Sequence, residues 1–146
     1  MSATKHYLKD YKRPDYRIDA MSLWVDIDPK LTRVRSRFQV FRDKKAAEDA
    51  PLILHGTGFR CMRFFCHGKS LSIVASKDHP DEIVLHEVED GALFEIDTEL
   101  NPSESTDLTG LYAVGDRLFT QCEPHGFRRI TYGLDRPDVL TVFSVT

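Results

Sequence analysis

The 146-residue sequence has no apolar run as long as a signal peptide or a membrane-spanning helix. Its three cysteines, Cys61, Cys66 and Cys122, are odd in number and lack the spacing of a disulfide framework. The net charge is only −3, so no strong overall field attracts nucleic acid or an anionic membrane. We therefore expect a cytoplasmic protein with reduced thiols that binds neither nucleic acid nor membrane.

The sequence also lacks a long helical pattern, an internal repeat and a low-complexity segment. Instead, apolar and polar residues alternate with a period of two over residues 21–27 and 32–40, as in half-buried strands. Residues 28–30, Asp-Pro-Lys, have turn chemistry and predict a hairpin. The polar face of the second strand carries Arg33, Arg35 and Arg37. We interpret this face as a solvated surface in preference to a binding stripe.

Shorter runs of the same kind follow, separated by turn-forming residues. They span residues 52–54, 60–65, 71–75, 83–86 and 93–100. Residues 44–50 tolerate a helix, but their polarity favours a loop. Many short strands at roughly even spacing predict an all-β fold. We expect an antiparallel β-sandwich with little helix, formed as a single domain by residues 1–146.

Two motifs that would indicate chemistry are incomplete. His86-Glu87 begins a zinc-binding H-E-x-x-H motif, but Asp90 stands where the second histidine is needed. Gly68-Lys69-Ser70 ends like a phosphate-binding loop, yet Arg63 stands where that loop needs its first glycine. We therefore predict no metal ligands in this chain.

Residues 101–139 differ from the rest, because alternation weakens and polar, aromatic and charged side chains crowd together. A loop-rich segment of this composition commonly carries function. Here Cys122 and His125 lie three residues apart, which leaves a small thiol enzyme as one alternative, although no third orienting group is identifiable. The sequence ends at residues 142–146 within what reads as a new strand, so we expect a fragment of a longer chain.

The same segment carries one discontinuous motif. Its parts are Thr120-Gln121-Cys122-Glu123, Arg128, Ile130-Thr131-Tyr132 and Leu134-Asp135-Arg136-Pro137-Asp138-Val139. The motif resembles the end of the first domain of aminopeptidase N enzymes, a family of zinc-dependent metallopeptidases, and its bacterial members in particular. Asp10-Tyr11 and Pro14-Asp15-Tyr16 look like the opening of that domain.

The resemblance implies the amino-terminal domain of an enzyme that removes N-terminal residues from peptides, with residues 101–139 bordering the substrate cleft. It implies that Glu123 binds the α-ammonium group of a peptide with a free N-terminus. Gln121 would lie beside Glu123 and line the pocket for the first side chain. The remaining motif residues would support the loop, and these are Arg128, Asp135 and Pro137.

The zinc motif of the family and its G-A-M-E-N motif do not occur in this sequence. In the family both lie in the following domain. We therefore expect zinc and the catalytic residues in a downstream catalytic domain of the same chain, against which this domain would dock. The 146-residue chain alone is expected to be inactive. A free-standing β-sandwich binding module without catalysis is the alternative.

Overall fold

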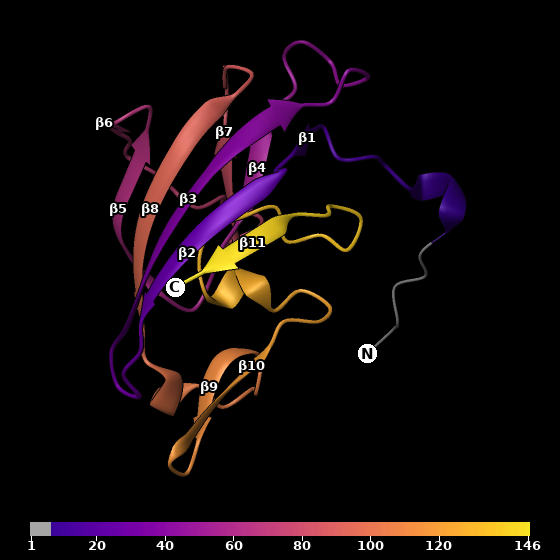
Figure 1. The fold of residues 1–146 in the computed structure, drawn as a ribbon. Coiled ribbons are helices and arrows are strands. Elements are labelled where there is room, and N and C mark those ends of the chain that lie inside the picture. Colours follow the sequence, from indigo (N-terminus) through magenta and orange to yellow (C-terminus); the bar gives the residue numbers. More distant parts are fainter. Residues whose placement is uncertain (1–6) are drawn as a thin grey trace.

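The computed structural model describes residues 7–146 (Figure 1). The strands are β1 (Tyr16–Arg17), β2 (Ala20–Asp26), β3 (Thr32–Arg42), β4 (Leu52–His55), β5 (Arg60–Cys66), β6 (Lys69–Ser70), β7 (Glu82–Leu85), β8 (Ala92–Leu100), β9 (Gly110–Val114), β10 (Arg117–Gln121) and β11 (Val142–Val145). Three short 3-10 helices join them, η1 (Leu8–Asp10), η2 (Pro102–Glu104) and η3 (Phe127–Arg129). The predicted all-β class with little helix is confirmed. No helix in this part of the chain is both long and apolar enough to cross a membrane.

Seven strands form the main sheet, in the order β11-β2-β3-β8-β5-β6, with β1 pairing with β3. The predicted hairpin is confirmed as β2 and β3, with Leu23 opposite Ser36. Asp28 closes its turn, because the Asp28 carboxylate accepts the backbone N–H groups of Lys30 (2.8 Å) and Leu31 (3.0 Å). All pairs in the sheet are antiparallel except β11 with β2, which is parallel.

The core lies between the main sheet and the two-stranded sheet β4–β7, which is behind the main sheet in Figure 1. Buried and accessible residues alternate strictly along β8, as the period-two pattern predicts. Its inward side chains include Phe94 and Ile96, and β4 supplies Leu52 and Leu54 from the opposite layer. This two-layer packing is the predicted sandwich.

Arg33, Arg35 and Arg37 of β3 lie on the outer face of the sheet and are more than half exposed, which confirms the interpretation as a solvated face. Each faces a carboxylate of β8. The pairs are Arg33–Glu99 at 3.0 Å, Arg35–Asp97 at 3.1 Å and Arg37–Glu95 at 3.6 Å. Cross-strand pairing of opposite charges therefore stabilises the face that the hydrophobic pattern leaves in water.

Two local predictions need correction. Residues 71–75 do not form a strand, because only Ala75 makes an isolated bridge, to Ile83, and Val74 is 83% exposed. Conversely, the loop-rich segment contains the hairpin β9–β10, which projects from one end of the main sheet (Figure 1). Its residues are mostly exposed or half-buried, so no apolar face produces the alternation that would have revealed it.

Candidate functional site

The candidate site is the segment that follows β10. A tight turn at residues 122–126 comes first, closed by the Gly126 N–H group, which donates to the Cys122 carbonyl at 2.7 Å. Gly126 is required here, since a Cβ atom at this position would meet the Cys122 Cα atom at 2.7 Å. The chain then enters η3 and returns over residues 131–139, which form no strand and contain a turn at residues 137–138.

Glu123 lies on this turn, and Gln121 ends β10 directly before it. The Gln121 side-chain amide donates to the Glu123 carbonyl at 3.1 Å, and both residues are exposed. None of the ion pairs among residues 7–146 involves the Glu123 carboxylate. Glu123 borders a hollow of about 330 Å³ that is also lined by Phe127, Leu134 and Asp135. Gln121 and Glu123 are thus adjacent, and the Glu123 carboxylate is accessible to a ligand.

Arg128 and Asp135 form the most highly connected ion pair of the segment. One Asp135 carboxylate oxygen accepts both the backbone N–H of Arg128 (3.1 Å) and its Nε–H (2.9 Å). The Arg128 guanidinium also donates to the Asp135 carbonyl at 3.0 Å and to the Asp81 carboxylate at 2.6 Å. The Arg128 and Asp135 side chains are only 15% and 11% exposed. Charge-assisted bonds of this number fix η3 to the returning segment.

A histidine that the sequence did not point to also contacts Asp135. We call His55, Arg128 and Asp135 together the frame of the site. His55 ends β4, and its Nδ1 atom accepts the backbone N–H of Asp135 at 3.2 Å. Burial lowers the pKa of His55, with the Arg128 charge as the second cause, so the imidazole is neutral at pH 7. A lone histidine 80 residues away from its partner along the chain gives no sequence signal of this contact.

A second cluster holds the end of the segment. The Asp138 carboxylate accepts hydrogen bonds from Arg136 at 2.9 Å and 2.8 Å and from the Tyr11 hydroxyl at 2.9 Å. The Arg136 bond is the main cause that lowers the pKa of Asp138 to about 2. Pro137 is exposed in the turn between the two residues of this ion pair. Its supporting role stays a prediction.

The thiol alternative gains no support from the geometry. Cys122 is half-buried, and burial, followed by the Asp135 charge, raises the pKa of its thiol. A raised pKa disfavours the thiolate that a nucleophile needs. As for metals, residues 7–146 contain no group of three or more His, Cys, Asp or Glu side chains that could hold an ion.

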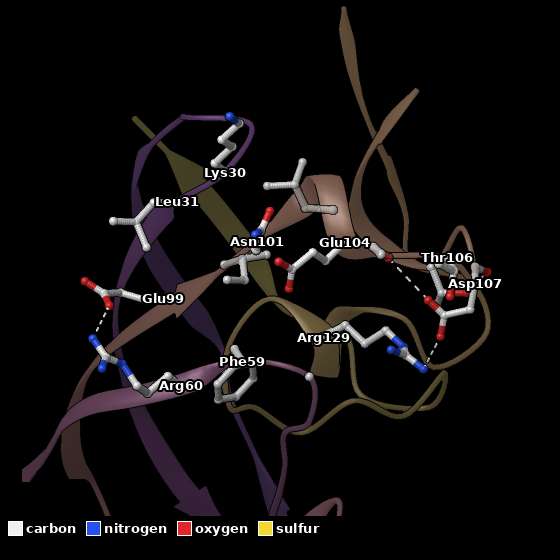
Figure 2. Close-up of a pocket in the computed structure, with 15 residues that line it drawn as sticks. Lys30, Leu31, Phe59, Arg60, Glu99, Asn101, Glu104, Thr106, Asp107 and Arg129 are labelled. Atoms are coloured by element: carbon white, nitrogen blue, oxygen red, sulfur yellow. Dashed lines mark hydrogen bonds and ion pairs between the residues drawn. The ribbon is translucent and has the colours of Figure 1, made fainter. Parts of the chain in front are cut away.

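A larger hollow than the one beside Glu123 lies elsewhere and does not include Glu123 or Gln121. It measures about 740 Å³, and Figure 2 shows Glu104 at its centre. The Arg60–Glu99 ion pair stands at one side, and Arg129 pairs with Asp107 at the other. Glu123 and Gln121 are the residues that the motif singles out, so we place the candidate site there and not in this larger hollow.

The chain matches no protein-family model. It is 38% identical to aminopeptidase N of Escherichia coli (strain K12) over 138 residues, which cover 94% of this chain and 15% of that protein. Aminopeptidase N of Caulobacter vibrioides is 34% identical over 138 residues, again 94% of this chain and 16% of the relative. The chain therefore spans about a sixth of the length of these curated relatives.

Solved structures share the fold. Legionella pneumophila aminopeptidase A, in complex with aspartic acid, superposes with a TM-score of 0.81 and 25% identity over 94% of this chain and 16% of that chain. An M1 zinc metallopeptidase from Deinococcus radiodurans, bound to a Tyr-Ser-Ala substrate, gives a TM-score of 0.68 at 16% identity, over 90% of this chain and 32% of that chain. The second likeness concerns the fold alone.

Proposed function

We propose that this chain serves as the amino-terminal domain of a zinc aminopeptidase. The proposal is supported by the similarity to aminopeptidase N, which extends over 94% of the chain. Within that enzyme, the domain would supply part of the wall that binds the substrate α-amino group. The substrates would be peptides with a free N-terminus. The remaining five-sixths of such a protein would supply the chemistry.

The observation that carries this proposal is the state of Glu123. Its carboxylate is exposed, forms none of the ion pairs among the described residues, and sits on the turn that leads into η3, which the Arg128–Asp135 pair ties to the returning segment. An α-ammonium group pairs well with a pre-positioned carboxylate through charge-assisted hydrogen bonds. Fixing the amine also fixes how far the chain end reaches toward the scissile bond. A carboxylate so placed selects the terminal residue.

The described residues do not fit a catalytic zinc site, because they contain no ligand set for the metal. A zinc-bound water and a polarised carbonyl would be the metal's contribution to the reaction in the complete enzyme. Neither involves a residue of this chain. The role of the domain is recognition, with Gln121 beside Glu123 lining the pocket for the first side chain.

The surface around β11 would also serve as a docking face for the downstream catalytic domain. Around β11, large apolar side chains face solvent. They are Leu140 (89% exposed), Val142 (73%), Phe143 (47%) and Val145 (64%). Apolar patches of this kind mark interaction surfaces. β11 is an exposed strand at the edge of the main sheet. It therefore favours a domain that packs against another domain over the free-standing binding module.

The test is Glu123→Gln in the complete aminopeptidase. This change keeps the shape and removes the charge. The proposed pair with the α-ammonium group would be buried once substrate is bound, and losing one member of such a pair costs about 2–5 kcal/mol. We expect kcat/KM for peptides with a free amine to fall by about 30-fold or more. Zinc content should not change, and substrates with a blocked amine should lose little further.

Glu104→Gln is the matched control, since Glu104 is an exposed carboxylate that lines the other hollow. It should leave both substrate classes unaffected. Wild-type cleavage of free-amine peptides by Glu123→Gln, with zinc and stability intact, would show that Glu123 is an ordinary loop acid.

A further inference from the structure

His55 lies where the core meets the candidate site. Its backbone forms a two-way bridge with Gly133, with the His55 N–H donating at 2.8 Å and the Gly133 N–H donating at 3.1 Å. Its side chain is 11% exposed, and Nδ1 accepts the Asp135 N–H. An imidazole nitrogen that accepts an N–H group carries no proton, so His55 is in the neutral form with its proton on Nε2.

Two successive sets of contacts connect His55 to the turn that carries Glu123. Asp135, whose backbone His55 holds, accepts two hydrogen bonds from Arg128. Arg128 belongs to η3, which directly follows the turn at residues 122–126 that carries Glu123. In addition, the Thr57 N–H group, two residues after His55, donates to the Arg128 carbonyl at 2.8 Å. The position of the turn therefore depends on this frame.

We infer that His55 is a positioning residue: its neutral imidazole holds the Glu123 turn in place, and protonation of the imidazole releases it. Protonated Nδ1 carries a hydrogen, which would face the hydrogen of the Asp135 N–H group, so the acceptor becomes a second donor. The new positive charge would also stand near Arg128. This inference deepens the proposed function and rests on it for its significance in substrate binding.

The groups around the imidazole decide where on the pH scale the change falls. Burial is the largest cause and lowers the pKa of His55 below its ordinary 6.5, and Arg128 lowers it further. Glu82, 3.9 Å from Nε2, and Asp135 act in the opposite direction. Asp81 also faces His55 across the Arg128 guanidinium. The hollow beside His55 is also lined by Tyr11, His125, Arg136 and Asp138. The release is therefore expected on the acid side of pH 6.5.

The experiment is an NMR titration of the ¹⁵N-labelled 146-residue chain from neutral to mildly acidic pH. In the wild type, the amides of Asp135 and of residues 123–128 should shift with the same midpoint as the His55 ring. The protection factor of the Asp135 amide, which is its intrinsic exchange rate at each pH divided by the observed rate, should fall about tenfold below that midpoint, the change expected for one lost hydrogen bond.

Two variants separate positioning from packing. His55→Asn places a side-chain oxygen near the Nδ1 position and does not titrate, so the turn amides should keep their neutral-pH shifts throughout. His55→Leu offers no acceptor, so these amides should start at the acid-side shifts. Should His55→Leu fail to fold, the comparison of wild type with His55→Asn decides alone. His125→Asn is the matched control, since His125 lines the same hollow, and it should titrate like the wild type.

Turn amides that titrate identically in the wild type and in His55→Asn would overturn the inference and assign the titration to the neighbouring carboxylates. Loss of the titration in His125→Asn would overturn it as well. None of these measurements involves substrate. Wild-type cleavage of free-amine peptides by Glu123→Gln would therefore refute the proposed function and leave the His55 contact standing. Amides that do not respond to pH in the wild type would refute the contact alone.

Discussion

Replacing Arg128 by methionine tests the frame of the candidate site most directly. Methionine keeps an unbranched apolar side chain and removes all the guanidinium donors. Three side-chain hydrogen bonds to Asp135 and Asp81 disappear. The Asp135 carboxylate, 11% exposed, then loses its counter-ion.

The size of the effect follows from that burial. Removing one partner of a buried ion pair destabilises a protein by about 3–5 kcal/mol, because the other charge stays behind without compensation. Both partners keep some access to water, with side-chain exposures of 15% and 11%, so we expect the lower end, about 3 kcal/mol. For a domain of this size, each 1 kcal/mol lowers the Tm by roughly 2–4 °C, which gives about 6–12 °C.

Urea and thermal unfolding of the chain, followed by circular dichroism, would measure the change. Arg37→Met is the matched control, because Arg37 pairs with Glu95 at 3.6 Å while their side chains are 53% and 45% exposed. Exposed pairs of this kind stabilise by less than about 1 kcal/mol, so its Tm should hardly change. Equal Tm values for the two variants would refute the idea that burial makes the Arg128–Asp135 pair structural.

Two further outcomes are expected. The carboxyl ¹³C signal of Asp138 should titrate with a midpoint of about 2, since the Arg136 hydrogen bond lowers its pKa from 3.8. The stability this pair contributes is complete above pH 3.8 and is lost as the pH falls through about 2. Arg136→Gln should raise the midpoint toward 3.8, and an unchanged midpoint would assign the effect to Tyr11. Finally, the 146-residue chain should bind no stoichiometric zinc and hydrolyse no aminoacyl anilide, because a catalytic zinc needs about three protein ligands. Metal analysis that finds one tightly bound zinc per chain would contradict this.

Much of the fold follows from local pattern. Alternation over residues 21–27 and 32–40 predicted the β2–β3 hairpin and which arginines face water, because a strand places successive side chains on opposite faces. The turn at residues 28–30 followed from its own side-chain chemistry. Such signals lie within a few residues of one another, so a single sequence contains them. The run at residues 71–75 shows the limit, since an apolar stretch becomes a strand only where a partner strand is available.

The resemblance carried by the motif at residues 120–139 named Gln121 with Glu123 and Arg128 with Asp135, and each pair is in contact in the structure. Only the tertiary structure decided which distant groups complete the site. Asp81 reaches Arg128 from 47 residues away, and His55 reaches Asp135 from 80 residues away. The parallel pairing of β11 with β2 is equally invisible in the sequence. Contacts of this kind exist because packing the two layers of the sandwich brings separate segments together, and no periodicity of one segment encodes its distant partner.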